Sequence, residues 1–127
     1  PLILSVPGMS PGRTESIAEL VDLFPTVCEL TSQQAPPGLH GISLGPVLKD
    51  HSATTKEGAL SFAKGTSWRT KDWAYIQYPD DTSELYDMRN DPGQFTNLAT
   101  NPEYTATRDH LSRQLSERLQ QYEQKRK

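Results

Sequence analysis

Apolar positions recur at different spacings along the chain, and the changes in spacing mark its elements. Residues 2–6 (LILSV) are almost continuously apolar, which predicts a strand buried inside a sheet. Residues 22–31 carry apolar side chains three and four positions apart, which predicts a helix with Asp22 as its N-cap and Pro25 in its first turn. Residues 42–48 predict a further short helical turn.

The middle of the chain favours strands. Residues 58–88 are rich in aromatic and β-branched side chains. Turn-forming residues at 70–72 and 79–81 interrupt this stretch, which predicts an antiparallel meander of three or four short strands. The sequence Asp-Pro-Gly at 91–93 predicts the turn that ends the meander.

The C-terminal segment predicts the longest helix, over residues 101–124. Asn101 is a suitable cap, and Pro102 suits the first helical position, where its missing N–H costs nothing. One face carries apolar residues at helical spacing: Tyr104, Leu111, Leu115, Leu119 and Tyr122. We expect this stripe to pack on the chain's own sheet, and a partner-binding face is the alternative. The elements together predict an α+β fold with a small antiparallel sheet of about four strands on this helix.

Composition narrows the classes of function. The 127 residues fall within the range of one domain, and 34% of them are hydrophobic. A net charge of -3 gives no reason to expect a nucleic acid or an anionic membrane surface as partner. No apolar run approaches the roughly 20 residues that span a bilayer. The single cysteine excludes an internal disulfide.

Most of the chemically versatile side chains favour a structural interpretation. Cys28 lies on the apolar face of the helix predicted over 22–31, where a cysteine usually behaves as a small hydrophobic residue. The three histidines (His40, His51 and His110) are far apart and lack the spacing of metal ligands. The acidic residues between 80 and 91 lack the spacing of a calcium-binding loop. We therefore predict no metal ligands in this chain.

The segment 64–70 (KGTSWRT) is the best candidate for contact with a substrate. Its candidate residues are Lys64, Trp68 and Arg69. An arginine can hold a sulfate or carboxylate in a two-pronged fork, and a tryptophan can stack on a sugar ring. The alternative is an ordinary meander, with Trp68 in the sheet core and Arg69 paired to a nearby carboxylate.

Five segments, in order, resemble the sulfatase family. They are residues 1–8 (PLILSVPG), 19–26 (ELVDLFPT), 37–44 (PGLHGISL), 68–75 (WRTKDWAY) and 83–99 (SELYDMRNDPGQFTNLA). The last is similar to the family's signature ELYDL-x-x-DP-x-E-x-x-NLA, and the set resembles the iduronate-2-sulfatase-like group of formylglycine-dependent sulfatases, in the alkaline phosphatase superfamily. Gln94 and Ala74 depart from the pattern, where the family has Glu and often Lys.

The resemblance implies a fragment of a longer enzyme. Residues 1–50 would be the end of a large α/β domain, and residues 51–127 a small C-terminal subdomain that forms one wall of the substrate cleft. The parent would hydrolyse sulfate esters of sulfated sugars with a formylglycine nucleophile and calcium. Cys28 lies outside any C/S-x-P-x-R motif, so the nucleophile would belong to an upstream catalytic domain. The family is often periplasmic, secreted or lysosomal.

Two alternatives stay open. The first is a stand-alone binding or adaptor domain, against which stands the buried strand expected at the start of the chain. The second is the same tail in a related phosphodiester or phosphonate hydrolase, which only the upstream nucleophile motif would distinguish from a sulfatase.

Overall fold

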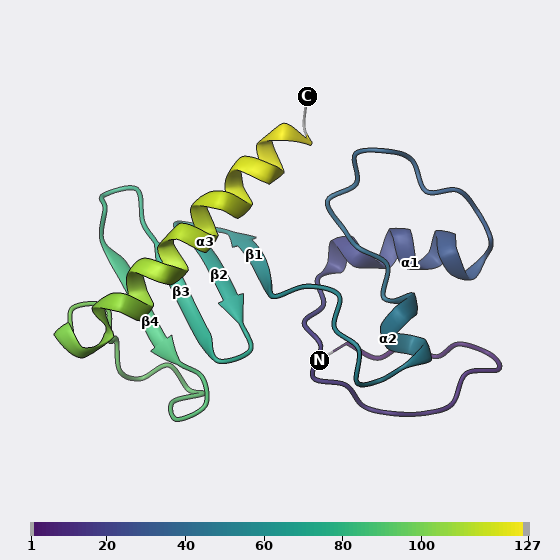
Figure 1. The fold of residues 1–127 in the computed structure, drawn as a ribbon, viewed down its shortest axis with the longest axis horizontal. Helices are drawn as coiled ribbons and strands as arrows, with labels where there is room; N and C mark the ends of the chain where they lie inside the picture. Colours follow the sequence, from purple (N-terminus) through teal and green to yellow (C-terminus); the bar gives the residue numbers. More distant parts are fainter. Residues whose placement is uncertain (1, 126–127) are drawn as a thin grey trace. The chain divides into compact units, whose positions relative to one another are not determined.

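The computed structural model describes residues 2–125, and the chain divides into two compact units, Pro1–Glu57 and Gly58–Lys127. Figure 1 follows the chain through its helices and strands. The predicted α+β class is confirmed: helices and one four-stranded sheet make up the fold. No helix within residues 2–125 combines the length and apolar content needed to cross a bilayer.

The first unit holds two helices. A short 3-10 turn, η1 (Leu20–Asp22), leads into α1 (Leu23–Leu30), and α2 (Gly45–Lys49) follows after a long loop. Thr26 ties α1 to this loop, because its hydroxyl donates to the Asp22 carbonyl at 2.6 Å and accepts the Leu44 amide at 2.9 Å. Both helices were expected from the apolar spacing, and each begins or ends within a few residues of its predicted bounds.

The strand predicted over residues 2–6 is not formed. This segment has no regular secondary structure, and Leu2, Ile3 and Leu4 are 44%, 88% and 38% exposed. A strand needs a neighbour to receive its backbone hydrogen bonds, and the sheet of this chain lies within the second unit. The apolar run is therefore present without the pairing that would bury it.

Asp22 precedes α1 as predicted, but its side chain does not cap the helix. Its carboxylate is fully buried and accepts the backbone amides of Glu19 and Ile42, each at 2.8 Å. The Lys56 ammonium, with 4% of its side chain exposed, lies 2.7 Å from Asp22 Oδ1 and 2.7 Å from Glu19 Oε2. One buried cluster of charges thus joins three separated segments of the first unit.

The second unit is a four-stranded antiparallel meander with a long helix. Its strands are β1 (Gly58–Phe62), β2 (Thr66–Thr70), β3 (Trp73–Gln77) and β4 (Ser83–Asp87), in the spatial order β1-β2-β3-β4. The turns at 70–72 and 79–81 separate strands where the sequence predicted.

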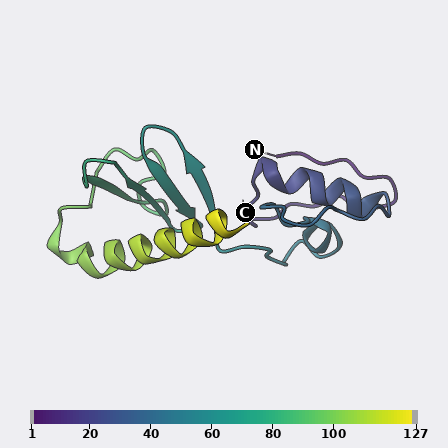
Figure 2. The ribbon, with the colours of Figure 1, turned by 90° about the horizontal axis from the view of Figure 1, so that it is seen from above.

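The helix that follows the meander starts as the sequence predicts. The Asn101 side chain accepts the Glu103 amide at 3.0 Å, and the short turn η2 (Pro102–Tyr104) runs into α3 (Thr105–Gln124). Figure 2 shows α3 lying along one face of the sheet.

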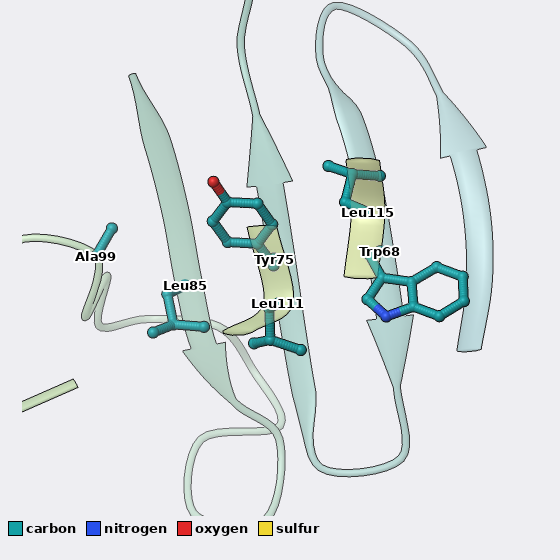
Figure 3. Packing of buried hydrophobic residues seen from close by; sticks show 6 residues of the cluster. All are labelled: Trp68, Tyr75, Leu85, Ala99, Leu111 and Leu115. Atoms are coloured by element: carbon teal, nitrogen blue, oxygen red, sulfur yellow. The ribbon is translucent and has the colours of Figure 1, made fainter. Parts of the chain in front are cut away.

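The core of the second unit lies between the sheet and α3. Figure 3 shows its members, which are Trp68, Tyr75, Leu85, Ala99, Leu111 and Leu115, all 5% exposed or less. Tyr104 and Leu119 pack against this cluster, and the ring of Tyr122 lies 5.3 Å from that of Phe62. The apolar stripe of the helix therefore packs on the chain's own sheet, as predicted.

The loop after β4 closes the outer side of that strand. Asn97 Oδ1 accepts the Leu85 amide at 3.0 Å and the Ala99 amide at 2.9 Å. The Leu98 amide donates to the Leu85 carbonyl at 2.8 Å. Residues 97–99 (NLA) of the signature segment thus hydrogen-bond to the middle of β4, and they place Ala99 in the core.

Candidate functional site

The β1–β2 hairpin carries the three residues that the sequence singles out. Lys64 is exposed in the turn between the two strands. Gly65 follows it and passes close to β3: a Cβ there would lie 2.7 Å from the Gln77 carbonyl oxygen. The glycine is therefore required for the turn to fold against β3, and it holds Lys64 at the end of the hairpin.

Trp68 lies in the middle of β2 and points into the core beneath α3. Its side chain is 5% exposed, and its indole N–H donates to Gln114 Oε1 at 3.2 Å. Gly58 lies against the ring, since a Cβ at that position would come within 2.6 Å of it. The ring is enclosed and has no free face in this structure, so Trp68 stabilises the contact of the sheet with the helix.

Arg69 lies on the opposite face of the sheet, because successive side chains of a strand alternate. In the register of the sheet it stands between Ala59 of β1 and Ala74 of β3. Its Nη1 is buried and has no hydrogen-bond partner among residues 2–125. Burial lowers the pKa of its guanidinium.

The structure therefore does not gather the three candidates into one site. Lys64 belongs to a turn, and Trp68 and Arg69 belong to opposite faces of the sheet. The segment 64–70 was interpreted either as a substrate contact or as an ordinary part of the meander. The core position of Trp68 fits the second interpretation. The expected pairing of Arg69 with a carboxylate is not seen among residues 2–125, where its Nη1 has no hydrogen-bond partner. Whether these residues contact a substrate stays a prediction.

The same face as Arg69 carries a cluster that the sequence analysis did not single out. The Glu84 carboxylate accepts hydrogen bonds from the Tyr78 hydroxyl at 3.1 Å and from the Tyr86 hydroxyl at 2.9 Å. Burial, together with the bond to Glu84, raises the pKa of Tyr86 to about 12. The hydrogen bond to Glu84 also raises the pKa of Tyr78. The sequence could have predicted that Glu84 and Tyr86 lie side by side, because residues two apart in a strand share one face of the sheet.

This cluster predicts a loss of stability at alkaline pH. The pKa of the Tyr86 phenol is raised from 10.0 to about 12, so the folded state keeps a proton that the unfolded chain releases earlier. Its contribution is fully present below about pH 10 and is lost as the pH rises towards about 12. Urea unfolding across this range should show a steeper fall in the free energy of unfolding for the wild type than for Tyr86→Phe. Equal slopes would contradict the assignment.

Metal ligation is not supported by the described part of the chain. Within residues 2–125, no three side chains of the His, Cys, Asp and Glu types come together as a metal site would require. Cys28 is buried in α1, 8% exposed. Asp80 and Asp91 bind nearby backbone amides in turns. These residues do not fit a calcium site or a formylglycine nucleophile, so we derive no reaction step from them.

Comparison with known proteins gives the chain a family. Residues 1–122 match the family described as "N-sulphoglucosamine sulphohydrolase, C-terminal". Arylsulfatase K of Mus musculus is 31% identical over 134 aligned residues, which take in 91% of this chain and 24% of the mouse protein. The chain spans between 22% and 54% of the length of curated relatives that it matches.

Solved structures of enzymes also resemble this chain in fold. A protein solved in complex with its substrate D-glucosamine-2-N,6-O-disulfate superposes with a TM-score of 0.73 at 26% identity, covering 81% of this chain and 24% of that one. A phosphonate monoester hydrolase from Silicibacter pomeroyi reaches a TM-score of 0.78 over 92% of this chain and 28% of its own, and its 24% identity shows a shared fold alone. From the match over residues 1–122, the chain belongs to the N-sulphoglucosamine sulphohydrolase C-terminal family, and it is similar to the C-terminal region of sulfatases.

Proposed function

We propose that this chain is the C-terminal part of a longer sulfatase that hydrolyses sulfate esters of sulfated sugars. The observation that carries the proposal is the family match over residues 1–122, together with relatives about four times as long. In this proposal the chain supports the fold and forms one wall of the substrate cleft. The formylglycine nucleophile and the calcium ligands belong to the part of the longer protein that the chain does not span.

The surface of η1 and α1 supports an upstream partner within the same protein. Apolar side chains remain open to solvent along it: Leu20 (81%), Val21 (51%), Phe24 (55%), Val27 (56%) and Leu30 (36%). The opposite side of these elements is buried through Asp22, Thr26 and Cys28. A run of exposed large apolar residues on one helical surface is typical of an interaction site. This supports a chain that packs on another domain.

The contact of Lys64 or Arg69 with substrate is part of the same proposal. Both are cationic, and both are at least partly exposed. A sulfated sugar carries anionic groups that such side chains bind. Trp68 would contribute by holding β2 in place, since its ring lies in the core.

The first test is catalytic. We expect the purified chain to hydrolyse no aryl sulfate and to show no calcium-dependent change in its unfolding transition, since no described residues form a metal site. The longer protein should hydrolyse the aryl sulfate in a calcium-dependent way. Turnover that co-purifies with the chain alone would overturn the proposal.

A second candidate reaction is phosphonate or phosphodiester hydrolysis, because a phosphonate monoester hydrolase from Silicibacter pomeroyi shares this fold. The longer protein separates the two when it is assayed with matched aryl sulfate and aryl phosphonate esters. A kcat/KM in favour of the phosphonate would select the second reaction. The upstream sequence gives an independent check, because a C/S-x-P-x-R motif is expected for the sulfatase.

A further inference from the structure

The guanidinium of Arg69 is an unusual feature of the second unit. It is a charged group in the middle of a sheet, with Nη1 buried and without an acceptor among residues 2–125. A buried polar group without a hydrogen bond is costly, and a charged one more so. Such a group in a native fold calls for a partner that the described chain does not supply.

The neighbours of Arg69 explain why its Nη1 finds no acceptor among residues 2–125. Its cross-strand partners are Ala59 and Ala74, whose methyl groups accept no hydrogen bond. Among the four strands, Glu84 supplies the carboxylate on this face, and its oxygens already accept the hydroxyls of Tyr78 and Tyr86. The sheet thus presents a cation between two small residues, on a face whose strand carboxylate already accepts two hydroxyl groups.

We propose that Arg69 is the anchor of an oxyanion site on the face of the sheet opposite α3. The partly exposed side chain can turn about its torsions so that two N–H groups meet one anionic group in the bidentate geometry that guanidinium favours. Flanking alanines leave room for this approach, which larger side chains at those positions would restrict. The ligand is a sulfate or carboxylate group from outside the described chain.

Two sources of that group fit the chemistry. One is the sulfate of a substrate, and the other is a carboxylate side chain of an upstream catalytic domain. Both sources rest on the proposed function, whereas the site itself rests on the geometry of the sheet. A failure of the sulfatase assay would therefore leave the anion site standing, and a failure of anion binding would leave the sulfatase assignment standing.

The experiment is a titration of this chain with inorganic sulfate, followed by the NMR resonances of arginine Nε–H groups. Sodium chloride of matched ionic strength separates binding from general salt effects. The resonance that disappears in Arg69→Lys is assigned to Arg69, and we expect it to shift saturably with sulfate. In Arg69→Lys, the amide of Ala74 should report affinity roughly tenfold weaker, because lysine lacks the planar fork.

The matched control is Arg113→Lys, since Arg113 is an exposed arginine on α3. This variant should retain the saturable shift of Arg69. A parallel titration with acetate separates the sources: saturation by sulfate alone supports a sulfate group, and saturation by acetate supports a carboxylate. The proposal is overturned if neither anion saturates, or if every arginine resonance drifts together.

Discussion

Replacing Lys56 with methionine is expected to destabilise the first unit by about 3–5 kcal/mol. The substitution keeps most of the side-chain volume but removes the positive charge that offsets the fully buried Asp22 carboxylate. Breaking a buried pair by removing one partner leaves an uncompensated charge in a medium of low dielectric. The loss should appear in denaturant unfolding and in faster exchange of the Ile42 amide, which donates to Asp22.

A surface ion pair provides the control. Lys49 lies 2.9 Å from Glu29, but the two side chains are 66% and 38% exposed. Lys49→Met should therefore cost no more than about 1 kcal/mol. If both methionine variants lose the same free energy of unfolding, burial is not what makes the Lys56 cluster important. Adding Asp22→Asn to Lys56→Met should recover part of the loss, since the amide is neutral.

The second large effect is expected for Leu85→Ala, which should cost about 2–5 kcal/mol. Leu85 is 0% exposed and lies in the core between the sheet and α3 (Figure 3). Truncation removes buried apolar contacts and leaves a cavity that neighbouring side chains fill only in part. Denaturant unfolding measures the loss, and exchange of the Leu98 amide, which donates to the Leu85 carbonyl, reports it locally.

Phe95 is the matched control for Leu85. It is a large apolar residue of the same unit, but it is 91% exposed. Phe95→Ala should change the free energy of unfolding by no more than about 0.5 kcal/mol. A comparable loss in the two variants would mean that the assigned core does not hold the second unit together.

The second unit was largely predictable from the sequence because its signals are local. The cap residue Asn101 and an apolar stripe at helical spacing predict the helix over 101–124. Strand alternation places Trp68 and Arg69 on opposite faces of the sheet. These arguments need only the spacing of residues along the chain.

What escaped prediction depends on partners far away in sequence. An apolar run at 2–6 predicts a strand, but pairing requires neighbours that no local pattern reveals. Asp22 has the position of a helix cap. Its carboxylate instead accepts hydrogen bonds from the Ile42 amide and the Lys56 ammonium, which lie 20 and 34 residues further along the chain. That Arg69 Nη1 has no acceptor among residues 2–125 likewise depends on a register that sets two alanines beside it. The substrate-contact role of Lys64, Trp68 and Arg69 stays a prediction.

The contacts of Asn97 and Leu98 with β4 also bear on aggregation. β4 is the last strand of the sheet, and an edge strand with free backbone groups is a template for pairing with another molecule. Here the amide and carbonyl of Leu85, at the centre of that edge, are already bonded to Asn97 and Leu98. An intruding strand would have to displace both contacts before it could extend the sheet. The signature loop thus protects the β4 edge of the sheet against pairing with another molecule.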